Sequence, residues 1–279
     1  MEQHITTQNQ SIMGAIIQAR MTSTRLPGKI LMPVYKSISM LEMVIMRVHS
    51  CPEIDTVIVA TTINKTDDPV IKLCHDLKPK YPKLQVFRGS ENNVLCRFYF
   101  AAHKYHLKHI IRITSDCPLI QPNILSQMIK EYYGVNQNNQ NNQNNDDSDY
   151  DYLSNTLVRT FPRGLDAEIF KTSALDRAYL DTNTTNAEIE HVTPYINSQP
   201  DKFQLHSWSQ KENYSNYRLT VDTQEDLNLI KLIYATLYPT NPLFTQEDII
   251  ELLKQNPDWL KINAEIEQKT YSNRGIVKA

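Results

Sequence analysis

Three cationic side chains lie close together just after the first apolar run of the sequence. The run Ala15–Ile17 is short and partly β-branched, and the polar segment after it contains Arg20, Arg25 and Lys29 among several hydroxyl side chains. Guanidinium groups form paired hydrogen bonds with phosphate oxygens, and a turn such as Pro27–Gly28 can present backbone amides to the same ligand. This combination predicts a binding site for the phosphates of a nucleotide.

The cationic segment matches neither of the two common glycine-rich nucleotide motifs. A Walker A loop needs a glycine where Ser23 stands, and no G-x-G-x-x-G fingerprint occurs anywhere in the sequence. A surface loop that is simply rich in arginine and lysine is the plainer alternative. Carboxylates elsewhere in the sequence favour the phosphate site.

Two aspartates each follow a β-rich run directly. Asp116 comes after the run IIRITS, and Asp222 comes after RLTV. Carboxylate oxygens suit Mg²⁺, which usually takes one or two of them together with phosphate oxygens and water. Singly, Asp116 could be a turn residue before Pro118 and Asp222 a helix N-cap. Together with the cationic segment, they predict a magnesium-dependent site for phosphoryl or nucleotidyl transfer.

Alternating strands and helices are predicted to position these side chains. Apolar runs indicate strands at 15–17, 56–60, 85–87 and 109–114, and helix signals lie at 41–48, from 67 onward and from 92 or 93 to about 106. Such alternation is typical of a doubly wound, mainly parallel α/β sheet, whose ligands bind beyond the carboxyl ends of the strands. We therefore expect the cationic segment and both aspartates at the same edge of the sheet.

The second half of the sequence continues this pattern after a low-complexity interruption. Residues 136–149 are rich in asparagine and are predicted to form a disordered surface loop, as is the polar tail 1–11. The D-x-D tripeptide at the edge of the asparagine repeat is interpreted as chance. The remaining patterns predict strands at 151–155, 202–208 and 217–223 and helices at 172–181, 187–198, 224–237 and 246–254. We expect a single domain over 12–254, with a smaller region at 151–209, followed by a C-terminal extension at 255–279.

Size and composition narrow the functional classes. The chain has 279 residues, 41% of them hydrophobic, and a formal net charge of −2, which argues against a general nucleic-acid-binding protein. The four cysteines form no C-x-x-C pair, so we expect reduced thiols and neither a zinc site nor a disulfide framework. No apolar run of eighteen residues or basic leader occurs, and we expect a cytoplasmic protein without membrane contact.

Taken together, the motifs resemble those of the cytidylyltransferases that make CMP-activated sugar acids, such as acylneuraminate and 3-deoxy-manno-octulosonate cytidylyltransferases. The resemblance lies in IIQARMTSTRLPGKIL, RITSDCPLI and VDTQEDL, and it points to the spore coat polysaccharide (SpsF-like) branch through YLSNTLVRTFPRGLDAEIF and EHVTPYI. It implies a Rossmann-like, GT-A-like nucleotidyltransferase fold that uses CTP and Mg²⁺. It also implies a homodimer formed through the smaller region.

The resemblance further implies roles for individual residues. Asp116 and Asp222 match the metal carboxylates and, with Arg20 and Lys29, form the expected catalytic set. The residues expected to bind the nucleotide are Ala19, Arg20, Ser23, Arg25, Lys29 and Arg88, the last beside the cytosine.

The acceptor site is expected in the smaller region. Arg159 and Arg163, near Asn155 and Asp166, could bind a carboxylate and hydroxyls of a sugar acid, although surface charge pairing explains them as well. Glu190 and His191 belong to the EHVTPYI motif, in which Ile189 replaces the usual arginine of the branch. His191 is the best candidate for a general base, with simple packing in a helix as the alternative.

These observations predict an enzyme that transfers CMP from CTP to a hydroxyl of a sugar acid or related polyol and releases pyrophosphate, in the synthesis of surface polysaccharide precursors. One alternative is a glycosyltransferase that uses a nucleotide sugar and needs no triphosphate. The other is a non-catalytic nucleotide-binding subunit, which the presence of all four charged residues disfavours.

Overall fold

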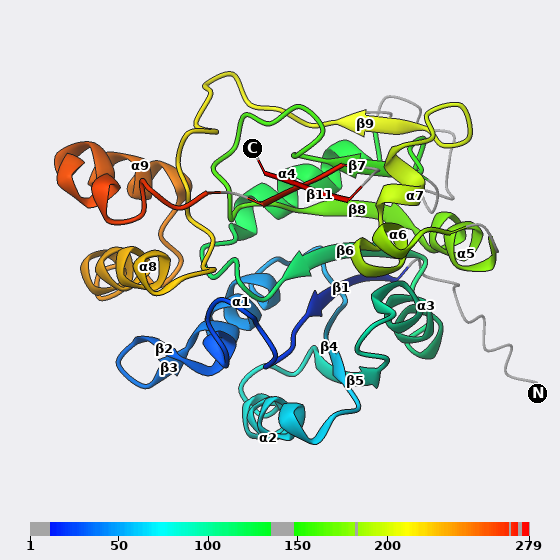
Figure 1. Cartoon of the computed structure of the whole chain (residues 1–279), viewed down its shortest axis with the longest axis horizontal. Helices are drawn as coiled ribbons and strands as arrows, with labels where there is room; N and C mark the ends of the chain where they lie inside the picture. Colours follow the sequence, from blue (N-terminus) through cyan, green and yellow to red (C-terminus); the bar gives the residue numbers. More distant parts are fainter. Residues whose placement is uncertain (1–11, 135–147, 182–183, 268, 273–274, 279) are drawn as a thin grey trace, which may run out of the picture.

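A seven-stranded sheet forms the centre of the protein (Figure 1). The computed structural model describes residues 12–134, 148–181, 184–267, 269–272 and 275–278. The predicted tail 1–11 and residues 136–147 of the predicted low-complexity loop lie outside the described residues. The strands are β1 (Met13–Gln18), β4 (Thr56–Thr62), β5 (Leu84–Gly89), β6 (His109–Thr114), β7 (Tyr152–Ser154), β8 (Glu168–Lys171) and β9 (Leu205–Ser207).

The sheet is mainly parallel, which confirms the predicted fold class. Its strand order is β5-β4-β1-β6-β8-β7-β9, and only β8 pairs antiparallel with its two neighbours. The chain builds the sheet outward from β1 through β4 to β5 and then crosses to β6 on the other side of β1. This reversal is a topological switch point, where α/β sheets open a crevice beyond their carboxyl ends.

Helices cover both faces of the sheet (Figure 1). The α-helices are α1 (Met40–His49), α2 (Asp68–Leu77), α3 (Val94–Lys104), α4 (Pro122–Tyr132), α5 (Thr172–Leu180), α6 (Asn186–His191), α7 (Pro194–Asn197), α8 (Gln224–Leu237) and α9 (Gln246–Gln255). Shorter elements are the 3₁₀ helices η1 (Lys29–Leu31), η2 (Lys65–Asp67) and η4 (Pro257–Ile262) and the hairpins β2 (Pro33–Tyr35) with β3 (Ile38–Ser39) and β10 (Lys269–Ser272) with β11 (Gly275–Lys278).

Alternate residues of the central strands point into two different hydrophobic cores. Ile17 of β1 and Val59 of β4 pack with α1, α4, α8 and α9 in one core, whereas Ile16 and Ile58 pack with α3 and α5 in the other. Because successive side chains of a strand point to opposite faces, a strand covered on both faces must be apolar throughout. This explains the continuous apolar runs in the sequence.

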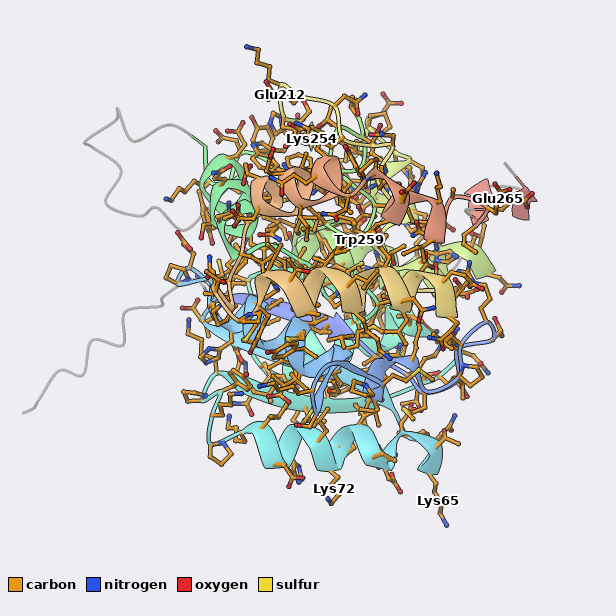
Figure 2. The ribbon with its side chains drawn as sticks, turned by 90° about the vertical axis from the view of Figure 1, so that its left-hand side faces the viewer. Lys65, Lys72, Glu212, Lys254, Trp259 and Glu265 are labelled. Carbon is orange, nitrogen blue, oxygen red and sulfur yellow. The ribbon has the colours of Figure 1, made fainter. Side chains whose placement is uncertain are left out.

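Charged side chains lie on the outer surfaces of the covering helices. Figure 2 shows Lys72 pointing outward from α2 and Lys254 from α9, and the Lys72 side chain is 82% exposed. The helix η4 packs on α8 and α9, so the first part of the predicted C-terminal extension joins the outer layer.

Two predicted elements differ from the structure. The predicted strand 217–223 is wrong, because this segment makes only an isolated parallel bridge between Arg163 and Arg218. The predicted helix 187–198 is wrong as a single element, because the chain turns sharply at Val192, between α6 and α7. In contrast, the predicted helix start at Thr223 is confirmed by a capping box with Asp226.

Candidate active site

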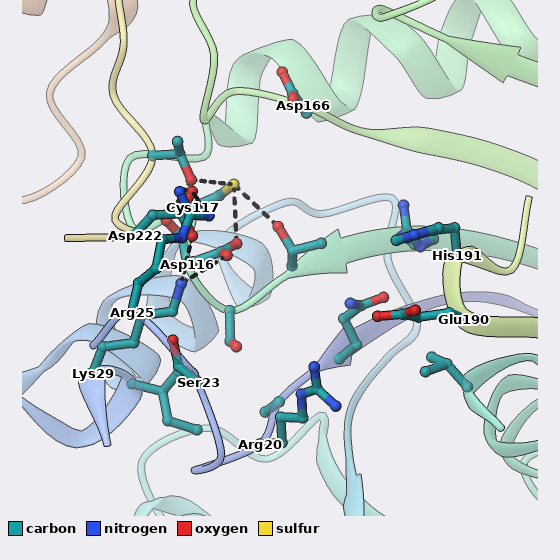
Figure 3. A pocket seen from close by; sticks show the side chains of 18 of the residues that line it. Arg20, Ser23, Arg25, Lys29, Asp116, Cys117, Asp166, Glu190, His191 and Asp222 are labelled. Atoms are coloured by element: carbon teal, nitrogen blue, oxygen red, sulfur yellow. Dashed lines mark hydrogen bonds and ion pairs between the residues drawn. The ribbon is translucent and has the colours of Figure 1, made fainter. Parts of the chain in front are cut away.

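A cleft of about 390 Å³ lies beyond the carboxyl ends of β1 and β6 (Figure 3). Lys29, Asp116 and Asp222 lie together at one end of the view, and Glu190 and His191 lie at the other. The cleft brings together eleven of the residues predicted from the sequence: Ala19, Arg20, Ser23, Arg25, Lys29, Asp116, Arg163, Asp166, Glu190, His191 and Asp222.

The cationic segment forms a closed loop after β1. The backbone amide of Met21 donates to Asp67 Oδ1 at 2.8 Å, and this buried carboxylate also accepts from the amide of Thr62 at the end of β4. The amide of Gly28 donates to the Met21 carbonyl at 2.9 Å, which closes the loop. Gly28 has φ +73°, a left-handed conformation that glycine adopts without steric cost. The loop therefore presents its side chains from a fixed backbone.

Lys29 joins the two predicted metal carboxylates. Its ammonium lies 3.0 Å from Asp116 Oδ2 and 3.0 Å from Asp222 Oδ1, and it donates to the Val221 carbonyl at 2.6 Å. Burial by itself disfavours the charged lysine, but the two carboxylates outweigh it and raise the pKa of Lys29 above its ordinary value. Burial likewise opposes ionisation of Asp116, but Lys29 and a hydrogen bond from Thr114 lower the pKa of Asp116. The pair is therefore charged at neutral pH.

The second oxygen of Asp222 is held by two arginines. Arg25 contacts Asp222 Oδ2 at 2.8 Å, and Arg218 contacts the same atom at 3.2 Å. Arg218 also pairs with Asp226, which accepts from the backbone amide of Asp222 at 2.9 Å. Asp222 is thus fixed from both its side chain and its backbone.

Backbone contacts bring residues 217–222 to Asp116 without a regular strand. The amide of Val221 donates to the Asp116 carbonyl at 2.9 Å, and the amide of Leu219 donates to the Arg163 carbonyl at 2.7 Å. The two segments cross closely at Gly164, where φ is +101° and a Cβ atom would lie 2.5 Å from the backbone carbonyl carbon of Leu219. Only glycine fits this crossing.

The oxygen donors at Lys29 fit a small hard cation. One oxygen of Asp116, one of Asp222 and the Val221 carbonyl all face the point where the ammonium lies. Among the described residues, no group of three or more histidine, cysteine, aspartate and glutamate side chains forms a metal cluster. Two carboxylates are nevertheless sufficient for Mg²⁺ when a nucleotide supplies phosphate oxygens.

Arg97 is a cleft residue that the sequence analysis missed. It lies on α3, is 2% exposed and donates to the Ser90 carbonyl at 2.8 Å, while its buried Nε has no hydrogen-bond partner in the described part of the chain. Burial, followed by repulsion from Arg20, lowers the pKa of Arg97 to about 10. The sequence did contain a signal for Arg97. It is a charged residue between the apolar Val94 and Phe98, on the apolar face of a predicted helix.

Arg88 does not lie in the cleft. Its guanidinium donates to the carbonyls of Thr62 and Asn64, both at 2.8 Å, and pairs with Asp68 at 2.8 Å. All three nitrogens of this arginine thus bind the segment after β4, and Arg97 is the arginine that α3 presents to the cleft.

A buried polar network supports the far end of the cleft. The Glu168 carboxylate pairs with Arg112 and accepts from Tyr152 at 2.6 Å and from Thr193 at 2.7 Å. Burial opposes the charged form, but Arg112 and these hydrogen bonds lower the pKa of Glu168. Arg112 also lines the cleft, so the network reaches the site. An arginine within the apolar run HIIRIT was the signal for it.

Glu190 and His191 lie at the end of α6, just before a strained turn. Val192 has φ 70° and ψ −55°, and the amide of Thr193 donates to the His191 carbonyl at 2.8 Å. These values describe a classical γ-turn, which is rare, especially at a β-branched residue. The turn joins the cleft residue His191 to Thr193, which binds Glu168. Burial lowers the pKa of His191, so the imidazole is neutral at pH 7.

The other predicted acceptor residues differ in whether a ligand in the cleft can reach them. Asn155 is fully buried, and its amide group hydrogen-bonds the backbone of Leu165 and Ala167. Arg159 lies outside the cleft lining and forms two hydrogen bonds to Asp166, at 2.6 and 3.0 Å. Arg163 lines the cleft, and burial together with the neighbouring Arg159 lowers its pKa. Arg163 is therefore the arginine of this region that a ligand in the cleft can reach.

Comparison with known proteins identifies the family to which the chain belongs. The family model described as "Cytidylyltransferase" matches residues 14–269, which include every site residue described above. The chain belongs to the cytidylyltransferase family. As a member of this family, the protein is a nucleotidyltransferase, and it has the mainly parallel α/β sheet of that class. Within the described residues, no helix is long and apolar enough to cross a membrane.

Relatives of this cytidylyltransferase family member span nearly its whole length. The spore coat polysaccharide biosynthesis protein SpsF of Bacillus subtilis is 33% identical over 249 residues, which are 87% of this chain and 94% of SpsF. A cytidylyltransferase structure from Leptospira borgpetersenii has 33% identity and a TM-score of 0.77, covering 94% of this chain and 100% of its own. A CMP:2-keto-3-deoxy-manno-octonic acid synthetase in complex with CTP shares the fold, with 15% identity, a TM-score of 0.56 and coverage of 81% and 99%.

Proposed function

We propose that this protein transfers CMP from CTP to a hydroxyl of a sugar acid or related polyol and releases pyrophosphate. The observation that carries the proposal is the meeting of Lys29 with Asp116 and Asp222 beside a fixed cationic loop, in a member of the cytidylyltransferase family. A triphosphate with a divalent cation requires both kinds of group at one site, because basic side chains bind the phosphates and carboxylates bind the cation.

In this proposal the triphosphate lies along the loop from Ala19 to Lys29. Arg20, Arg25 and Lys29 bind phosphate oxygens and stabilise the negative charge that develops as pyrophosphate leaves. Asp116 and Asp222 would hold Mg²⁺, which when bound would neutralise phosphate charge. The fixed loop and the fixed carboxylates keep the α-phosphorus in line with the attacking hydroxyl, and positioning of this kind supplies a large part of the rate.

The cytidine lies toward α3 in this proposal. Arg97 lines the cleft, and a base or ribose oxygen of the nucleotide would satisfy its buried Nε once binding uncovers that atom. A buried unsatisfied donor discriminates strongly between ligands that supply an acceptor and ligands that do not. The Arg97 environment therefore supports a role in nucleotide choice.

The acceptor occupies the other end of the cleft, near Arg163, Glu190 and His191. Arg163 would bind an anionic group of the acceptor, and Glu190 would accept hydrogen bonds from its hydroxyls. The neutral imidazole of His191 can take the proton of the attacking hydroxyl. The printed name of the relative SpsF supports a role in surface polysaccharide synthesis. A cytoplasmic homodimer joined through residues 151–209 is part of the same proposal.

The proposal is tested by pyrophosphate release from CTP with Mg²⁺ and a panel of sugar acids and polyols. Transfer of label from α-³²P-CTP to one acceptor, with one pyrophosphate per transfer and at least 100-fold less turnover in Asp222→Asn, is the expected result. Transfer of a sugar from a nucleotide sugar without pyrophosphate would identify a glycosyltransferase instead. CTP binding without turnover across the panel would identify a non-catalytic subunit.

A further inference from the structure

Lys29 is placed where a metal ligand set converges. Its ammonium contacts Asp116 Oδ2 and Asp222 Oδ1, both at 3.0 Å, and the Val221 carbonyl at 2.6 Å. Lys29 is only 7% exposed, and its position is fixed by the turn at Gly28 immediately before it. The three oxygens come from two separate segments of the chain and meet only at this nitrogen.

The remaining carboxylate oxygens point elsewhere. Asp222 Oδ2 is held by Arg25 and Arg218, and Asp116 Oδ1 accepts a weak hydrogen bond from Cys117 Sγ at 3.7 Å. Each aspartate therefore offers one oxygen to a shared cation, and in this structure the ammonium of Lys29 takes both. Oxygen-only donors of this kind suit a hard divalent cation equally well.

An ammonium and a divalent cation cannot occupy the same point, because their charges repel strongly at contact distance. We propose that Lys29 occupies the metal position in the free enzyme and leaves it for phosphate oxygens when nucleotide binds, so that metal enters only together with nucleotide. This proposal rests on the proposed function, since a triphosphate is the anion that draws Lys29 away. Lys29 then serves as a placeholder for the metal as well as a phosphate ligand.

The placeholder has a physical advantage over two bare carboxylates. Two negative charges close together would repel each other in a partly buried site, and the positive charge of Lys29 between them reduces this repulsion without a bound ion. When nucleotide binds, the ammonium of Lys29 can pair with the more highly charged phosphates. The metal ion then takes its place beside the two aspartates. In both states, a cation therefore lies between the two aspartates.

The first test measures Mn²⁺ binding without nucleotide, by electron paramagnetic resonance of the free ion. Wild-type protein should bind Mn²⁺ weakly, and Lys29→Met should bind it at least tenfold more tightly. The double variant Lys29→Met/Asp222→Asn should lose this gain. Lys83→Met is the matched control, because the Lys83 ammonium binds the carbonyls of Cys51 and Ile54 away from the cleft, and it should behave as wild type.

A second test uses wild-type protein, so it does not depend on the folding of a variant. A crystal structure with Mg²⁺ and cytidine 5′-(α,β-methylene)triphosphate should place Lys29 Nζ on phosphate oxygens and beyond hydrogen-bond distance of at least one of the two aspartates. Nζ still bound to both aspartates would overturn the proposal, as would Mn²⁺ affinity that is unchanged in a folded Lys29→Met variant.

The two proposals fail separately. Absence of pyrophosphate release from CTP with every acceptor, combined with a gain of Mn²⁺ binding in Lys29→Met, contradicts the cytidylyltransferase function but supports the exchange of cations at this site. Pyrophosphate release with no such gain, and with Lys29 still on both aspartates in the complex, contradicts only the placeholder.

Discussion

Arginines that lie near one another at the same edge of the sheet have different partners, and this difference predicts different roles. All three nitrogens of Arg88 bind the segment after β4, whereas Arg97 keeps a buried Nε without a partner in the described part of the chain. The family resemblance favoured Arg88, because it matches an arginine placed beside the cytosine. The hydrogen bonds explain why Arg97 is the better candidate for a nucleotide contact.

Arg97→Met should raise the KM for CTP about 10-fold to 100-fold, because a charge-assisted hydrogen bond contributes about 1.5–3 kcal/mol. Steady-state kinetics of pyrophosphate release will measure the change. Arg88→Met is the matched control and should alter the KM for CTP less than twofold. An equal rise in both variants would restore the role that the sequence predicted for Arg88.

His191 should set the acidic limb of the pH profile. Burial lowers its pKa below the ordinary value near 6.5, so the imidazole is neutral and able to accept a proton at pH 7. Turnover should therefore be flat above about pH 6.5 and should fall as pH drops through this lowered pKa. His191→Gln should reduce turnover at pH 7 by about 100-fold and remove that limb. An unchanged acidic limb in the variant would exclude His191 as the base.

At the scale of elements, the position of Asp222 depends on a close backbone crossing. Gly164→Ala should push residues 219–220 away from Arg163, since the new Cβ would lie 2.5 Å from backbone atoms of both Leu219 and Thr220. The expected result is at least a tenfold loss of turnover together with a lower Tm, because the amide of Val221 anchors this segment to Asp116. Full turnover in the variant would show that the crossing does not position Asp222.

The central strands and their helices were predictable because burial on both faces leaves a clear apolar run. The runs at β1, β4, β5 and β6 each lie in the sheet in the expected places. The segment 217–223 was misread because its alternation of apolar and polar residues reflects one buried side, without the ladder of hydrogen bonds that makes a strand. Asp222 nevertheless reaches Asp116, through single backbone hydrogen bonds that no periodicity encodes.

The helix prediction over 187–198 failed for a different reason. Apolar spacing continues through Val192, Tyr195 and Ile196, so the pattern gives no sign of a break. The break depends on tertiary contacts that hold a β-branched residue at positive φ, among them the bond from Thr193 to Glu168. The sequence also could not show that Arg159 and Asp166 form an ion pair with each other and that Arg159 is not left to bind an acceptor.

At the scale of the whole molecule, the sheet continues without a break from the nucleotide end to the predicted dimerisation region. Strands β7, β8 and β9 extend the same sheet beyond β6. The region 151–209 also contains exposed large apolar side chains, including Leu157 at 38% exposure. We place the expected contact between two copies of the chain in this region, and Leu157 is a side chain with which to test it.

The protein should have about twice the 32.4 kDa mass of one chain by light scattering. Leu157→Asp should shift this mass toward the monomer, because a buried carboxylate at a subunit contact is costly. Leu243→Asp is the matched control, since Leu243 is 39% exposed and lies outside residues 151–209. A monomeric wild-type protein, or equal effects of the two variants, would contradict a dimer joined through residues 151–209.

The most direct test of the central claim is calorimetric titration of wild-type protein with CTP, UTP, ATP and GTP in the presence of Mg²⁺. We predict one site per chain that binds CTP at least tenfold more tightly than the other three nucleotides, and at least a tenfold loss of that affinity in Asp222→Asn. Failure of CTP to bind, or undiminished CTP binding in Asp222→Asn, would contradict a nucleotide site built from Lys29, Asp116 and Asp222. Equal affinity for all four nucleotides would contradict CTP as the substrate.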